Sequence, residues 1–237
     1  MRRFLHEGPN LRRMLPAMTW RSPAIDQGVM GHPYGVRRDD LPARTQTHVH
    51  TGGMKFTLHY EGKLPAQRAG KEDKAVIRDA IEGQLRELWQ HQPLSIGSYL
   101  DPEPKEGSVS ALTHRYGHSW AALVSEQMGL RAELDVLLLT PRPSASVVHG
   151  GDIDNRVKTL LDGLSAPAQA NQLPSNMRET SPTEPQFVLL DDDRLVTRLN
   201  VESERLLGAA DPDTAYVTIR VNIALTRWML GNVALAG

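Results

Sequence analysis

Apolar and polar residues alternate in short runs along this chain, and in two longer runs the apolar residues recur every three or four positions. The alternation of Phe56, Leu58 and Tyr60 with polar neighbours predicts a strand. Residues 71–91 carry the longer spacing, which predicts an amphipathic helix that ends before Pro93. The apolar face of this helix consists of Val76, Ile77, Ile81, Leu85, Leu88 and Trp89.

The second half of the chain continues with strands and one further helix. The apolar run from Val136 to Leu139 predicts a central strand that is buried on both faces. A second helix is predicted over 154–164, and the next segment, 165–186, holds four prolines without periodicity, as is typical of a long loop. Alternation over 194–225, interrupted by a turn, predicts an antiparallel hairpin.

Together these elements predict an α+β fold, in which one small mixed or antiparallel sheet packs against two principal helices. Residues 1–52 have no sustained period and hold eight Lys and Arg against four Asp and Glu, which predicts a flexible basic N-terminal extension. Such an arm suits a nucleic-acid backbone, although a solvated extension without a partner explains the same composition. Residues 53–237 would form one domain with a proline-rich insertion at 165–186.

Composition excludes several classes of protein. The chain holds no cysteine, which excludes disulfides and thiolate metal sites. No apolar run reaches the about 18 residues of a transmembrane helix, and the start lacks the apolar core of a signal peptide, so we expect a cytoplasmic protein without a membrane partner. The formal net charge of −1 neither indicates nor excludes a nucleic-acid-binding protein, because a local basic surface can be offset elsewhere.

Two acidic clusters lie where predicted elements begin or end. Asp152 and Asp154 stand at the entry to the second helix, and Asp191, Asp192 and Asp193 follow an apolar strand. If the strands involved are neighbours, both clusters meet at one edge of the sheet, where carboxylate oxygens suit Mg²⁺ or Mn²⁺. Each cluster alone is explained more simply by a capped helix or a charged turn, and only their combination favours a metal site.

Several basic and amide side chains near these acids are candidates for binding a phosphate. Lys158 follows Asp154 by one helical turn on the same face, where its ammonium group could bind a phosphate or orient a water. Asn155 could hold an aspartate in place or contact the substrate. Four arginines are further candidates for phosphate contacts, although an ordinary surface role explains each one as well: Arg142, Arg156, Arg194 and Arg198.

The run DIDNRVKTLLDGL, followed by LLDDDRLV, resembles the RusA family of Holliday junction resolvases of bacteria and prophages. The family motif D-x-D-N-x-x-K-x-x-x-D-x-L is matched from Asp152 to Leu164, and the later acidic pair and valine are matched by Asp191, Asp192 and Val196. The resemblance covers roughly residues 53–226, where strand, long helix, strand, motif helix and hairpin follow in the family's order.

The resemblance implies a homodimeric, Mg²⁺-dependent endonuclease, encoded by a bacterium or phage, that cleaves branched DNA such as four-way junctions in recombination and repair. By position, it implies that Asp152, Asp154 and Asp192 bind the metal, with Asp191 as the alternative to Asp192, and that Lys158 is essential. Two equivalent sites related by a two-fold axis suit paired cuts in symmetric strands.

The chain departs from the family pattern in its N-terminal extension, in the long loop at 165–186 and in a long predicted loop between the first helix and the central strand. These departures bear on the DNA substrate more than on the metal chemistry. Two other functions also fit the residues. One is a non-catalytic DNA-binding or regulatory relative of the same fold, and the other is a metal-binding structural protein without a nucleic-acid role.

Overall fold

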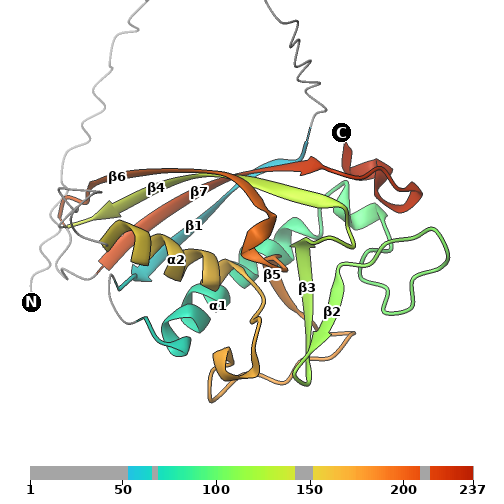
Figure 1. The fold of residues 1–237 in the computed structure, drawn as a ribbon, viewed down its shortest axis with the longest axis horizontal. Helices are drawn as coiled ribbons and strands as arrows, with labels where there is room; N and C mark the ends of the chain where they lie inside the picture. Colours follow the sequence, from blue (N-terminus) through green and yellow to red (C-terminus); the bar gives the residue numbers. More distant parts are fainter. Residues whose placement is uncertain (1–52, 66–68, 142–151, 209–213, 237) are drawn as a thin grey trace, which may run out of the picture. The chain divides into compact units, whose positions relative to one another are not determined.

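A computed structural model describes residues 53–65, 69–141, 152–208 and 214–236. For Asp152 and Ala236 it describes the backbone and not the side chain. The predicted N-terminal extension therefore lies outside the described residues. The described elements form an α+β fold, as predicted, but they build two sheets rather than one (Figure 1). No helix in these segments is both long and apolar enough to cross a membrane.

The larger sheet has the strand order β1–β7–β4–β6. It consists of β1 (Lys55–Lys63), β4 (Leu130–Thr140), β6 (Val196–Arg205) and β7 (Thr214–Leu225). β7 runs antiparallel to β1 and β4, whereas β6 runs parallel to β4. The predicted hairpin over 194–225 is therefore wrong, because β4 lies between β6 and β7. Alternation indicates which face of a strand is buried, but it does not indicate which other strand lies next to it in the sheet.

β4 is central, as its apolar run predicts, but only one of its faces is fully buried. Every second residue from Leu130 to Thr140 is at most 3% exposed and points to the inner face, toward the core. The residues between them are partly exposed on the outer face of the sheet. The predicted burial on both faces is therefore wrong, because within the described segments no further layer covers the outer face (Figure 1).

The smaller sheet has the order β2–β3–β5 and was not predicted in full. It consists of β2 (Leu112–Arg115), β3 (His118–Val124) and β5 (Gln186–Leu190). β2 and β3 form an antiparallel pair inside the stretch predicted as a long loop, and β3 pairs with β5 in parallel. Almost every residue of β3 is buried, so its sequence lacks the alternation that marks a strand with one solvated face.

The two principal helices pack on the inner face of the larger sheet and against each other. They are α1 (Lys71–Leu88) and α2 (Asp152–Leu164), which differ from the predicted bounds by two or three residues. The predicted core residues Ile77 and Ile81 are at most 1% exposed, whereas Val76 is 56% exposed and lies off the buried face.

The remaining regular structure is four 3-10 helices, η1 (Leu94–Ile96), η2 (Ala170–Gln172), η3 (Asp193–Leu195) and η4 (Leu230–Ala236). The segment 165–186 was predicted as a long loop, and apart from η2, two isolated bridges and Gln186, which begins β5, it has no regular structure, which confirms the prediction. This loop is tied to the smaller sheet, because the Ala166 amide donates to the Leu190 carbonyl oxygen at 2.9 Å.

Candidate metal and DNA site

The first acidic cluster lies at the start of α2. Asp154 is exposed in the first turn, and Lys158 is exposed one turn later, so both are open to a ligand on the same face of the helix. The side chain of Asp152 lies outside the described residues, as does Arg142. The described part of this cluster therefore offers one carboxylate and one ammonium group.

Arg156 and Asn155 occupy the same first turns but differ in their surroundings. The Arg156 guanidinium donates to the carbonyl oxygen of Leu64, directly after β1. This contact holds the half-buried Arg156 against the end of β1, and the phosphate contact expected of this residue stays a prediction. Asn155 has an exposed side chain, while its carbonyl oxygen accepts a 2.8 Å hydrogen bond from Thr159 Oγ1.

The contact of Arg156 also locates the start of α2 relative to the larger sheet. β1 ends beside the first residues of β7, and those residues of β7 pair with the end of β4. Because Arg156 bonds to the residue after β1, α2 begins at the end of the sheet where β4 and its parallel neighbour β6 both finish. Figure 1 shows α2 running back from there toward β5.

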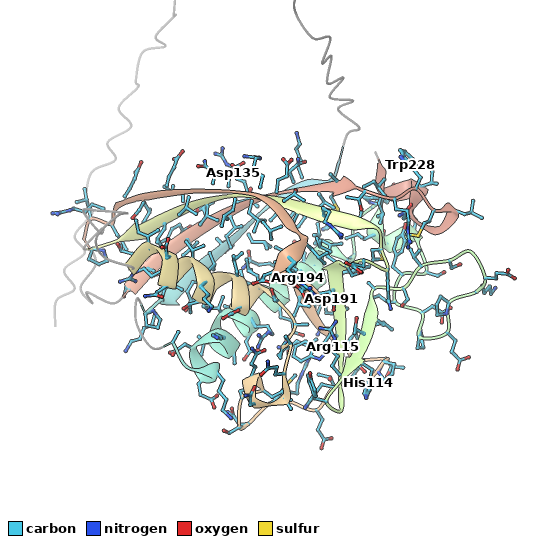
Figure 2. All side chains as sticks on the ribbon, viewed as in Figure 1. His114, Arg115, Asp135, Asp191, Arg194 and Trp228 are labelled. Atoms are coloured by element: carbon cyan, nitrogen blue, oxygen red, sulfur yellow. The ribbon has the colours of Figure 1, made fainter. Side chains whose placement is uncertain are left out.

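In the second cluster, Asp191 directly follows β5 and serves the fold. Its amide donates to the Val124 carbonyl oxygen at 2.9 Å, and its carboxylate accepts two hydrogen bonds from Arg115 Nη2, at 2.7 and 2.8 Å. Figure 2 labels Asp191 and Arg115, which join β5 to β2. With its charge paired and its side chain 19% exposed, Asp191 is poorly placed to bind an ion.

Asp192 is more accessible and caps the next element. Its carboxylate accepts hydrogen bonds from the Arg194 guanidinium at 2.7 and 2.9 Å and from the Arg194 amide at 2.9 Å. These bonds from Arg194 lower the pKa of the Asp192 carboxyl to about 2, so it is ionised near neutral pH. Because the Arg194 side chain is 86% exposed, water screens its ion pair with Asp192, which therefore contributes little to stability.

Within one chain, α2 separates the two clusters. Ser165, directly after α2, forms a parallel bridge with Leu190, so the three aspartates after Leu190 lie beside the end of the helix. Asp154 stands at its start, and the 11 positions from Asp154 to Ser165 span about 16 Å along a helix axis. Accordingly, no group of three or more Asp, Glu, His or Cys residues in the described segments lies close enough to hold a metal ion.

The predicted meeting of the two clusters at one sheet edge is thus not found among the described side chains of a single chain. The assignment of Asp152, Asp154 and Asp192 as ligands of one ion stays a prediction, because the side chain of Asp152 is not described. Lys158 lies beside Asp154, and Arg194 beside Asp192, so the predicted residues whose side chains are described form two separate groups.

Another aspartate of the motif, Asp162, joins the two helices. Its carboxylate lies 2.7 Å from Lys74 Nζ, and its carbonyl oxygen accepts a 3.0 Å hydrogen bond from Arg78 Nη2. Arg78 Nε donates to the Ser165 carbonyl oxygen at 3.1 Å, and the side chain stacks on Trp120. Burial lowers the pKa of Arg78 to about 10. The sequence did not indicate this buried arginine, since it lies in a helix of many charged residues.

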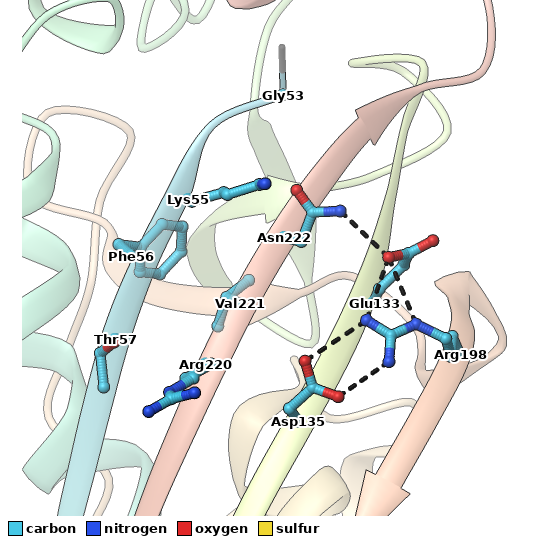
Figure 3. Close-up of a pocket in the computed structure, with 10 residues that line it drawn as sticks. All are labelled: Gly53, Lys55, Phe56, Thr57, Glu133, Asp135, Arg198, Arg220, Val221 and Asn222. Carbon is cyan, nitrogen blue, oxygen red and sulfur yellow. Dashed lines mark hydrogen bonds and ion pairs between the residues drawn. The ribbon is translucent and has the colours of Figure 1, made fainter. Parts of the chain in front are cut away.

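The outer face of the larger sheet carries a cavity of about 510 Å³, lined in part by charged side chains, that the sequence analysis missed (Figure 3). Arg198 donates to Glu133 and Asp135 over 2.8–3.3 Å, and Asn222 donates to Glu133 at 3.0 Å. The bond from Asn222 lowers the pKa of Glu133, and the bonds from Arg198 lower that of Asp135. Arg198, predicted as a phosphate contact, is therefore neutralised by two carboxylates.

No protein-family model, curated protein or solved structure matches this chain. The resemblance to the RusA family therefore rests on the two sequence motifs.

Proposed function

We propose that this protein is a Mg²⁺-dependent endonuclease that cleaves branched DNA such as four-way junctions, with Mn²⁺ as the alternative ion. The observation that carries the proposal is the pair Asp154 and Lys158, exposed together on one face at the start of α2. Asp192 supplies a second accessible carboxylate, which its pKa of about 2 keeps ionised.

Each of these side chains has a role in the proposed reaction. The carboxylate oxygens of Asp154 and Asp192 are hard ligands that fit Mg²⁺, which when bound activates a water and offsets charge on the scissile phosphate. The Lys158 ammonium group would bind an oxygen of that phosphate or orient the attacking water. Arg194, once released from Asp192, would contact a neighbouring phosphate, and Asn155 would contact the substrate beside Asp154.

The proposal requires a homodimer, because α2 holds Asp154 and Asp192 of one chain at its opposite ends. In a two-fold dimer, Asp154 of one copy can meet Asp192 of the other copy, and the same contact then recurs at a second, equivalent site. Two such sites would serve the paired cuts that resolve a four-way junction. The partners in this proposal are therefore branched DNA and a second copy of the chain.

A non-catalytic DNA-binding relative is the alternative, and one observation favours it. Asp191 and Asp192 both have an arginine as their cationic partner, so neither carboxylate needs a metal ion for charge balance. A protein of this kind would bind a four-way junction in Ca²⁺ and leave it uncut in Mg²⁺. The proposed endonuclease would bind the junction in Ca²⁺ and cut it in Mg²⁺.

The test is cleavage of a labelled four-way junction in Mg²⁺ by the parent chain, Asp154→Asn and Asp193→Asn. We expect Asp154→Asn to cut at least about 100-fold more slowly, because it removes a charge that would act on the transition state. Asp193→Asn is the matched control, since it removes an exposed charge next to the proposed ligand Asp192. Equal rates for Asp154→Asn and the parent would refute the proposed mechanism.

A further inference from the structure

A cavity of about 490 Å³ lies between α1 and the loop at 165–186. Carboxylates of α1 fasten the loop across this cavity through hydrogen bonds of 2.8–3.2 Å, from Ser175 to Glu72, from Gln186 to Asp79 and from Arg178 to Glu82. The cavity therefore has a helix as one wall and a fastened loop as the other. Its volume falls in the range of about 300–1,000 Å³ that is typical of sites for small molecules.

A buried cation, Arg78, lines this cavity and is only 4% exposed. Its Nε and Nη2 donate to carbonyl oxygens at the end of α2, and its guanidinium stacks on Trp120. Nη1 has no hydrogen-bond partner in the described segments. With a pKa of about 10, Arg78 stays charged near neutral pH. A fixed cation with an unused N–H group is suited to an anionic oxygen of a ligand.

A carboxylate stands next to this cation, because Asp79 lines the same cavity. Its Oδ1 accepts the hydrogen bond from Gln186 Nε2, whereas its Oδ2 has no partner among the described residues. Gln186 is 7% exposed and donates through its amide nitrogen, which leaves its Oε1 as a further acceptor. These two oxygens are suited to a positively charged group with several N–H donors.

Apolar side chains line another part of the cavity, among them Val76 and Met177. Val76 was predicted as a core residue of α1, yet it is 56% exposed. Met177 comes from the loop at 165–186 and is half-buried. An aliphatic group held between the helix and the loop would cover both side chains, and removing this apolar surface from water favours binding.

We propose that this cavity binds a free α-amino acid with an aliphatic side chain. The carboxylate of the ligand accepts from Arg78 Nη1, its ammonium group donates to Asp79 Oδ2, and its side chain packs on Val76 and Met177. The two charged groups of an α-amino acid share one carbon atom, so they need a cation and an anion side by side. The neighbouring residues Arg78 and Asp79 provide this pair in one cavity.

Other ligands fit this cavity less well. A phosphate group would bring two negative charges against Glu72, Asp79 and Glu82, which all line the cavity. A divalent cation would lie beside the Arg78 guanidinium, and the described segments contain no group of three or more acidic, histidine or cysteine side chains close enough to hold one. The cavity shares no lining residue with the proposed metal and DNA site, so this inference does not rest on the proposed function.

Calorimetric titration of the full-length chain with L-leucine tests the proposal, and we expect binding at one site per chain. L-leucinamide lacks the carboxylate, and N-acetyl-L-leucine lacks the ammonium group. Each should bind at least about 10-fold more weakly, because a charged hydrogen bond is lost. These analogues test Arg78 without changing a side chain that joins the two helices. Absence of L-leucine binding at millimolar concentrations, or equally tight binding of either analogue, would overturn the proposal.

A pair of variants tests the carboxylate that would bind the ammonium group. Asp79→Asn keeps an oxygen that can accept from Gln186 but removes the negative charge. Glu87→Gln is the matched control, since Glu87 is an exposed acid of α1 that does not line the cavity. We expect L-leucine to bind at least about 10-fold more weakly to Asp79→Asn and with unchanged affinity to Glu87→Gln. Equal affinities of Asp79→Asn and the parent for L-leucine would contradict the site.

Discussion

Single residues of the acidic motif divide into those that hold the fold together and those that stay accessible. Asp162 binds Lys74 between the helices, and Asp191 is paired with Arg115. Asp154 is exposed, and the carboxylate of Asp192 is paired with the highly exposed Arg194. The sequence predicted Asp154 and Asp192 as metal ligands, but a row of three aspartates does not reveal which one a neighbouring arginine neutralises.

The pair of Asp192 and Arg194 predicts a dependence of stability on pH. The pKa of Asp192 falls from its ordinary value of 3.8 to about 2 on folding, so the pair stabilises the protein above about pH 4. This contribution is lost as the pH falls through the folded pKa. We therefore expect Asp192→Asn to lower the free energy of urea unfolding near pH 5, and the difference from the parent to shrink steadily toward about pH 2.

The control for this prediction is the same substitution in an Arg194→Leu background. Without the guanidinium, the main cause of the lowered pKa is gone, so the pH dependence of the difference should become weaker. A difference between Asp192→Asn and the parent that stays constant from about pH 5 to pH 2 would contradict the role given to Arg194.

The elements were predictable where one face of each is buried. Residue spacing predicted both helices, because burial of one face imposes a period of about 3.6. The absence of a period marked the loop at 165–186 and the acidic break before β6. β3 was missed since it is buried almost throughout and has no such period. The predicted partner of β6 was wrong, because β6 pairs with β4, which lies some 60 residues away in sequence.

The close packing of α1 against α2 predicts different effects on stability for substitutions at two glycines. A Cβ at Gly163 would lie 2.7 Å from Ile77 Cγ2, whereas a Cβ at Gly83 would meet nothing within 4 Å. We expect Gly163→Ala to lower the free energy of unfolding by about 1–3 kcal/mol, because overpacking forces the helices apart. Gly83→Ala should raise it by up to about 1 kcal/mol through helix propensity. Urea unfolding of both variants measures this, and a stabilising Gly163→Ala would contradict the close packing of α1 on α2.

For the whole molecule, the proposed function requires a metal site shared between two copies, because α2 keeps Asp154 and Asp192 of one chain apart. One chain holds Asp154 where β6 finishes and Asp192 where it starts, so a two-fold dimer is the simplest way to unite them. The sequence predicted the ligands and the dimer as separate features. The direction of α2 relative to β6 links them, and only the fold reveals that direction.

The most direct test of this shared site is complementation between two inactive chains. Asp154→Asn and Asp192→Asn are each purified, then mixed, unfolded and refolded together, and junction cleavage in Mg²⁺ is measured for each chain and for the mixture. About half of the dimers would be mixed, and each mixed dimer would keep one intact site of two, so we expect about a quarter of the parent's activity to return. A mixture as inactive as its two components would contradict a site built from both copies.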